Sequence, residues 1–476
     1  MRSKPRPSPA VMADGDESAR LVDRGDFFFR TESYSSALES YAQALGRLDG
    51  RGDHEARGVL LLKVARCHQA RGDMQQAIEC LDEAKVDLRS SRDGVQLGKL
   101  YALRATLLYE LGRYTRSLRY ADLAYKLLRG TGDNSAIAQL ELTLGSLWIR
   151  LGDPVQSGQF YTSALSTFRR IDDKVGTAKA LNNLGILHKN ACEWRESIRC
   201  FAGALELAEK QALIRFGVAV RLNLGIVHFK LGDWNLAEES LKRARQIATE
   251  NSFVAQLVPI DLALGNIERR RRRWSVAAEL YRGALERAEA NAYSRETILA
   301  LEFTGELHLD REEYEAAAAL LVRALARAEQ IAPLGDLVNE ICRRLGEARL
   351  GQEMYEEALA LGQKALSSSS KINDQYERAI ACRLVGLAYA RLGREVEARQ
   401  FIGEAIDSLT RVGESFELAR TFLMAGEVGD GSETEPAEWI KRAFGIFLSL
   451  ESRGYAARAA WAAAEWFVRR GRLDEG

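Results

Sequence analysis

Small residues recur along this chain with a period of 40 residues. Ten alanines follow one another at intervals of 40 or 41 residues: Ala44, Ala84, Ala124, Ala164, Ala204, Ala244, Ala284, Ala324, Ala365 and Ala405. A second ladder, made mostly of glycine, runs nineteen residues upstream and continues to Gly426: Gly25, Ala65, Ala105, Gly145, Gly185, Gly225, Gly265, Gly305, Gly346, Gly386 and Gly426. A fixed period of this size is the signature of a repeat array, which grows in one dimension without separate domain cores.

Each repeat predicts a pair of helices. In residues 177–209, apolar and small residues follow helical spacing up to Leu187, and a second amphipathic stretch begins at Trp194. The turn between two such helices often holds glycine, as at Gly112, Gly232 and Gly393. Glycine suits the left-handed conformation that ends a helix. We therefore expect antiparallel hairpins in which the small residues let the two backbones approach closely.

This pattern resembles the tetratricopeptide repeat. The motif positions in one unit are Leu224, Gly225, His228, Gly232, Trp234, Ala237, Leu241 and Ala244, and in another Val385, Gly386, Tyr389, Gly393, Ala398, Ile402 and Ala405. The 40-residue period resembles the arrays of kinesin light chain, of spindle-orientation adaptors and of bacterial transcription activators. The stretch 172–185 is most similar to the bacterial regulatory group.

The resemblance implies an all-α, right-handed superhelical solenoid of about eleven antiparallel hairpins and a terminal helix. We expect a disordered arm at residues 1–14, one continuous regular array over 15–427, and an irregular final repeat with the terminal helix at 428–476. Breaker residues at 428–436 predict a mobile loop or hinge. Exposed aromatic residues on the terminal helix favour a chain that is part of a longer protein.

Composition narrows the choice of partners. Lys and Arg total 67, as do Asp and Glu, so the chain is neutral, which argues against a nucleic-acid or membrane-surface binder. The sequence contains no apolar run as long as a membrane span and no secretory signal, so we expect a cytoplasmic protein. The six cysteines lack CxxC spacing and are expected to be reduced, buried residues of the helices.

The sequence predicts neither an enzyme nor a bound cofactor or metal. Four of the five histidines, namely His68, His188, His228 and His308, follow the small residue of the first helix by three positions. Equivalent positions in neighbouring hairpins lie about 8–10 Å apart, too far for shared zinc ligands. Structural packing is the favoured interpretation.

The run of five arginines at 269–273 has two interpretations. Because arginines at a helix C-terminus interact favourably with the helix dipole, a solvated helix end is the favoured one. The alternative is a docking patch for an acidic partner or a phosphate.

The wall formed by the first helices is the predicted binding surface. Its polar positions in the fifth to seventh repeats are Lys179, Asn182, Asn183, Asn190, Asn223, Lys230, Asn266 and Arg270. Asn can pair with the backbone of an extended peptide, and the cations favour acidic side chains. Acids follow in the eighth repeat, including Glu302, Glu306 and Asp310, so the groove would carry both signs of charge. The alternative is a polar face that is simply solvated.

These patterns leave more than one function open. The first hypothesis is a non-enzymatic module that binds a protein or an extended peptide in its concave groove. The second is the sensory or regulatory region of a longer bacterial transcription activator or signalling protein. A small-ligand receptor is the third.

Overall fold

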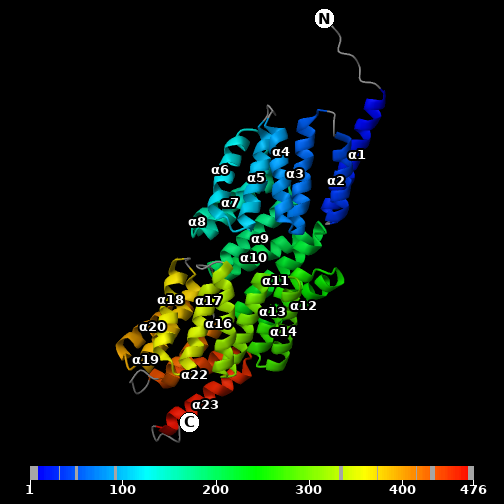
Figure 1. Ribbon diagram of the computed structural model, residues 1–476. Helices are drawn as coiled ribbons and strands as arrows, with labels where there is room; N and C mark the ends of the chain where they lie inside the picture. Colours follow the sequence, from blue (N-terminus) through cyan, green and yellow to red (C-terminus); the bar gives the residue numbers. More distant parts are fainter. Residues whose placement is uncertain are drawn as a thin grey trace. The chain divides into compact units, whose positions relative to one another are not determined.

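The computed structural model describes residues 9–31, 33–48, 52–89, 94–331, 336–371, 374–413, 415–428 and 435–469. Within these residues the chain forms 23 helices and no strand. They pair as eleven antiparallel hairpins followed by one terminal helix, which confirms the all-α helical-repeat solenoid that the tetratricopeptide-type pattern predicts (Figure 1). Of the predicted arm at 1–14, residues 1–8 lie outside the described residues, and the first helix begins at Pro9.

The chain divides into two compact units, residues 1–180 and 181–476. Unit 1 contains the helices α1 (Pro9–Arg30), α2 (Tyr34–Leu48), α3 (His54–Arg71), α4 (Met74–Leu88), α5 (Val95–Glu110), α6 (Tyr114–Leu128), α7 (Asn134–Arg150) and α8 (Pro154–Arg170). The boundary falls within α9 (Lys174–Asn190). It does not follow the predicted limits at residues 14 and 427, and these limits and the single continuous array stay predictions.

Unit 2 contains the remaining hairpins and the terminal helix. Its helices are α10 (Trp194–Lys210), α11 (Ile214–Leu231), α12 (Trp234–Glu250), α13 (Val254–Arg270), α14 (Trp274–Ala290), α15 (Ser294–Asp310), α16 (Tyr314–Ile331), α17 (Asp336–Gly351), α18 (Tyr355–Lys371), α19 (Gln375–Arg391), α20 (Glu395–Val412), α21 (Ser415–Val428), α22 (Glu435–Ser449) and α23 (Arg453–Arg469). Most of the loop predicted at 428–436 lies outside the described residues.

Short turns with one left-handed residue set the 20-residue spacing of the helices. At the end of α9, the Glu193 amide donates to the His188 carbonyl at 2.8 Å, and the Cys192 amide donates to the Lys189 carbonyl at 3.1 Å. This pair of bonds is a Schellman motif, and Cys192 has a φ of 60°. The prediction that every cysteine belongs to a helix is therefore wrong for Cys192, although all six cysteines are free.

The small residues lie where the two helices of a hairpin cross, as predicted. A Cβ atom added to Gly225 would lie 2.6 Å from Cγ of Leu241 and 3.3 Å from the Ala237 carbonyl oxygen. In another hairpin, the Ser197 hydroxyl donates to the Gly185 carbonyl across the same crossing at 2.8 Å. Glycine and serine here allow a backbone approach that a larger side chain would prevent.

Unit 2 closes on itself. One hydrophobic cluster joins residues of α11–α13, such as Trp234 and Ile260, to residues of α21–α23, such as Phe416 and Tyr455. The indole of Trp194 donates to the Val412 carbonyl at 2.8 Å, across 218 residues of sequence. Because both ends of the unit meet, the first helices of its hairpins surround an interior instead of forming an open wall.

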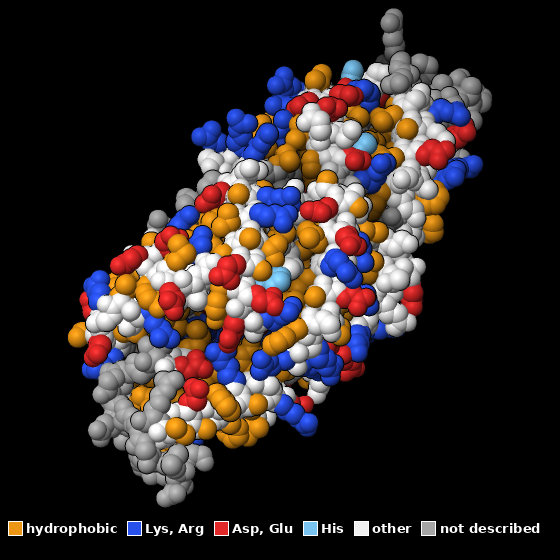
Figure 2. Space-filling model, turned by 60° about the horizontal axis from the view of Figure 1, so that its bottom comes forward, with side chains coloured by type: hydrophobic (Ala, Val, Ile, Leu, Met, Phe, Trp, Pro, Cys, Tyr) orange, Lys and Arg blue, Asp and Glu red, His pale blue; other side chains and the backbone are white. Residues whose placement is uncertain are grey.

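The charged side chains at the surface are mixed in sign, as the neutral composition leads one to expect. On the face shown in Figure 2, basic and acidic side chains lie among one another over most of the described surface. None of the helices, over the residues described, combines the length and the apolar character that a membrane crossing needs.

Candidate functional site

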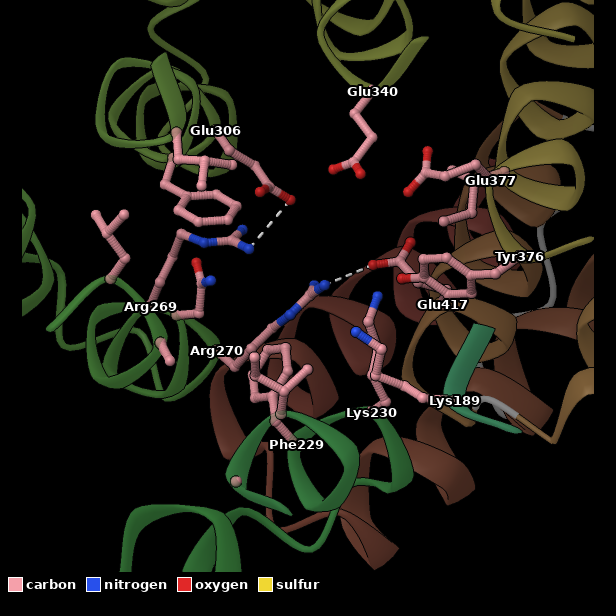
Figure 3. A pocket seen from close by; sticks show the side chains of 18 of the residues that line it. Lys189, Phe229, Lys230, Arg269, Arg270, Glu306, Glu340, Tyr376, Glu377 and Glu417 are labelled. Atoms are coloured by element: carbon pink, nitrogen blue, oxygen red, sulfur yellow. Dashed lines mark hydrogen bonds and ion pairs between the residues drawn. The ribbon is translucent and has the colours of Figure 1, made fainter. Parts of the chain in front are cut away.

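A cavity of about 340 Å³ lies inside unit 2 and is called the central cavity here. Its lining comes mainly from the first helices of the hairpins, α9, α11, α13, α15, α17, α19 and α21. Its apolar lining residues include Phe229, Pro259, Leu262, Phe303 and Ile380. Charged residues of both signs complete the lining, and Figure 3 shows ten of the residues around it with labels. The volume is in the range of small-molecule and peptide-side-chain sites.

Beside the cavity, buried arginines and acids neutralise one another. Arg269 lies 3.0 Å from Glu306, and Arg270 lies 2.6 Å from Glu417 (Figure 3). Arg269 is 2 % exposed and Arg270 is 5 % exposed. The prediction of a solvated helix end is therefore wrong for these two arginines, because acids from α15 and α21 surround them.

The network continues through α17, α19 and α21. Further pairs join Arg343 to Glu377 at 2.8 Å, Arg344 to Glu302 at 2.5 Å, Arg383 to Glu417 at 2.7 Å and Arg420 to Glu347 at 3.5 Å. A buried charge without a partner would be costly, so each charge here depends on several others. The acids that the sequence placed along one groove are thus the partners of the arginines.

Burial and neighbouring charges shift the pKa values of the carboxyl groups, some upward and some downward. Burial alone would raise the pKa of Glu417, but Arg270, Arg383 and Arg420 outweigh it and hold the pKa well below its ordinary value. Burial and the neighbouring Glu377 raise the pKa of Glu340 to about 7. Glu417 is therefore ionised at neutral pH, whereas Glu340 keeps its proton until the pH approaches about 7.

Burial and Glu377 also raise the pKa of Asp374, to about 6. Asp374 precedes α19, and its carboxylate accepts a hydrogen bond from the Glu377 amide at 2.9 Å. It lines the same side of the cavity as Tyr376 and Glu377. This side can thus change charge near neutral pH.

Four of the eight predicted binding residues line the central cavity. Asn190, Lys230 and Arg270 occupy the same helix position in three successive hairpins, and Asn266 lies one turn before Arg270. Asn266 accepts a hydrogen bond from the Tyr281 hydroxyl at 2.7 Å, which orients its side chain. These four residues thus share the lining of one cavity, and their role in binding stays a prediction.

The other four predicted residues lie elsewhere. Asn223 donates to Asn182 at 3.1 Å, and Asn182 donates to Asn183 at 3.4 Å, in a row on α9 and α11 outside the described lining. Lys179 belongs to unit 1, where its side chain is exposed. Sequence reasoning missed Lys189, Glu340, Tyr376, Glu377 and Glu417. Lys189 carried a usable signal, because it lies in the last turn of a first helix.

The repeated histidines pair with acids in the following turn. Nδ1 of His188 lies 2.5 Å from Glu193, and Nδ1 of His308 lies 2.5 Å from Glu313. His68 and His228 lie 3.6 Å from the acids five residues after them. Among the described residues, no three His, Cys, Asp or Glu side chains form a metal-binding group. The histidines thus act at helix ends, in agreement with structural packing.

Comparison with known proteins identifies no family for this chain. No protein-family model matches the chain, and no curated protein matches it. Among solved structures, a Rap protein complexed with competence and sporulation factor is 14% identical, with a TM-score of 0.47, and the match covers 71% of this chain and 99% of that one.

Two other solved structures cover the chain to different extents. Yeast Tom70 is 15% identical with a TM-score of 0.36 and covers 96% of this chain and 97% of its own. BtubC (BKLC) from P. vanneervenii is 22% identical with a TM-score of 0.37 and covers 50% of this chain and 92% of its own. At such identities and scores these similarities carry no argument about what the chain binds.

Proposed function

We propose that the chain is a recognition module without catalysis of its own, and that unit 2 binds a short segment of a protein or peptide in the central cavity. The observation that carries this proposal is a cavity of about 340 Å³, lined by both apolar and charged residues and held inside a closed ring of helices. Sites of this kind bury most of a small ligand and orient it through a few polar groups.

The charged groups around the cavity favour binding over catalysis. The arginines are held by carboxylates, as in the pairs Arg270–Glu417 and Arg343–Glu377. A ligand would thus meet arginines and carboxylates that their ion pairs hold in place. Acidic side chains of the ligand would bind near the basic residues of the lining, and basic side chains near its acidic residues.

A regulatory role is the second candidate, and the ring closure favours it. Arg270 on α13 and Glu417 on α21 meet beside the cavity. A ligand there would contact both ends of the ring and stabilise its closed form. Binding could in this way change the position of α21–α23, which a longer regulatory protein would use as a signal.

The test blocks the cavity without disturbing the charges. Ala263 is a half-buried residue of the lining on α13, so Ala263→Phe would fill part of the space. Ala290→Phe, at the exposed end of α14, is the matched control. We expect a peptide selected from an array of short peptides to bind the wild-type chain and the control, and to lose at least tenfold in affinity on Ala263→Phe. Equal binding by all three chains would refute the cavity as the site.

A further inference from the structure

Two lysines of the central cavity lack a carboxylate partner among the described residues. Lys189 at the end of α9 and Lys230 at the end of α11 both line the cavity. In Figure 3 their amines lie close together beside the ring of Tyr376. The amine of Lys230 is 3.5 Å from the centre of that ring, a cation–π contact. Every neighbouring arginine of the lining, in contrast, has an acid within ion-pair distance.

The two amines influence each other. Burial, together with the nearby charge of Lys230, lowers the pKa of Lys189, while Glu340, Asp374 and Asp336 act in the opposite direction. Two like charges in a partly buried site are a cost that an anion between them would relieve. Asp374 also feels the charge of Lys230, but no described carboxylate lies within ion-pair distance of either amine. An anion between the two amines would therefore lower their electrostatic energy further.

The surroundings define what kind of anion fits. Phe229 is on the same helix turn as Lys230, and Ile226 and Ile380 lie in the same lining, so the group beside the anion meets apolar atoms. Glu340 and Glu377 lie on the other side of the space that the amines face (Figure 3). The carboxylate of Glu377 disfavours a ligand with a second negative charge near it.

We propose that Lys189 and Lys230 form an anion subsite of the central cavity that binds a carboxylate attached to an apolar body. This assignment rests on the proposed function and deepens it, because a peptide with an apolar C-terminal residue has this chemistry. The two amines would donate charge-assisted hydrogen bonds to the carboxylate oxygens. The apolar body would lie on Phe229, Phe303 and Leu262.

The experiment uses three probes with the same aromatic group. Hydrocinnamate carries the carboxylate, hydrocinnamamide replaces it by a neutral amide, and phenyl phosphate carries a second charge. Binding to the full chain is measured by calorimetry and by saturation-transfer NMR. The variants are Lys189→Met, Lys230→Met and their combination, and Lys210→Met is the control. Lys210 lies on α10 outside the lining and pairs with Glu206 at the exposed surface.

We expect hydrocinnamate to bind wild-type protein at least tenfold more tightly than either other probe. Each cavity variant should weaken it by about tenfold or more, since a hydrogen bond to a charged group is lost. Lys210→Met should bind like the wild type. The comparison of probes on wild-type protein needs no variant and so does not depend on how the variants fold.

Several results would overturn the assignment. Equal binding of the acid and the amide would show that the lysines do not select an anion, and tighter binding of phenyl phosphate would contradict a monocarboxylate. Absence of hydrocinnamate binding would also refute it. If a peptide still binds and Ala263→Phe still blocks it, the proposed function stands while the subsite fails. If Ala263→Phe leaves peptide binding unchanged, the proposed function itself fails.

Discussion

Unit 1 and unit 2 are built from the same hairpin, yet they use charge differently. In unit 1, ion pairs such as Lys63–Asp26 at 2.6 Å and Lys99–Asp133 at 2.8 Å join helices near in sequence, and their side chains are about one-third exposed or less. In unit 2, the buried pair Arg270–Glu417 joins residues 147 positions apart. The comparison shows that the repeat sequence specifies the hairpin. Whether a charged side chain is solvated or buried in an ion pair depends instead on how the successive hairpins curve and which of them come into contact.

Removing one buried charge of unit 2 is the strongest test of this difference between the units. Glu417→Gln leaves Arg270, Arg383 and Arg420 without their shared carboxylate. Loss of one partner from a buried pair costs about 3–5 kcal/mol, so we expect unit 2 to lose that much stability. Hydrogen exchange followed by mass spectrometry measures it, because peptides from the two units are read separately.

The matched control for Glu417→Gln lies in unit 1. Asp133→Asn removes the charge that faces Lys99 in a partly exposed pair and keeps an oxygen for the Ala136 amide. The expected loss is about 0–1 kcal/mol. Similar losses in the two variants would show that burial of the network in unit 2 has no energetic consequence.

Overpacking the hairpin crossing should affect the two units alike. Gly145→Leu in unit 1 would place a Cβ 2.5 Å from the Tyr161 ring, and Gly225→Leu in unit 2 would place it 2.6 Å from Leu241. Each should lose about 1–3 kcal/mol, because the helices must separate. Urea unfolding of both variants tests this. An unchanged midpoint in either unit would mean that its crossing is looser than the repeat requires.

The pH dependence of unit 2 should have two branches. The raised pKa values of Glu302, about 8, Glu340, about 7, and Asp374, about 6, mean that the folded state holds protons which the unfolded state releases above about pH 4.5. Stability should therefore fall from pH 5 to pH 8, by about 1–3 kcal/mol. Below pH 4.5 the sign reverses, because Glu306 and Glu417, with lowered pKa values, must take up protons.

Variants separate the two branches. Glu340→Gln with Asp374→Asn should make the upper branch shallower and leave the acid branch, since asparagine still caps α19. The slope that remains in the upper branch belongs to Glu302. Glu239→Gln, an exposed change on α12, should leave both branches in place. Thermal unfolding from pH 3 to pH 8 gives the curves. An upper branch as steep in the double variant as in the wild type would show that Glu340 and Asp374 do not hold these protons.

Local pattern was enough to predict the hairpins and part of the site. The small residue at Gly225 and the turn at Gly232 are properties of one repeat, and the structure shows both. Position 190 and its equivalents at 230 and 270 were found because the period places them on one wall. The partner of Arg270 could not be predicted. Glu417 comes from a helix 147 residues away, and no periodicity encodes where an array turns back on itself.

The smallest expected effect lies in the turns, where the two units differ in residue type for one backbone shape. Gly112 in unit 1 and Ala292 in unit 2 both have left-handed backbone, with φ of 71° and 56°. Glycine adopts this conformation freely, whereas alanine is strained by about 1–2 kcal/mol, partly offset by the greater entropy that glycine gives the unfolded chain. Gly112→Ala should thus destabilise by about 1 kcal/mol, since an added Cβ has no atom within 4 Å and only the backbone is affected. Ala292→Gly should stabilise by a similar or smaller amount. A lower melting temperature for Gly112→Ala and a higher one for Ala292→Gly would show that the two turns are interchangeable between the units. A lower melting temperature for both variants would show that the turn in unit 2 depends on the side chain of Ala292.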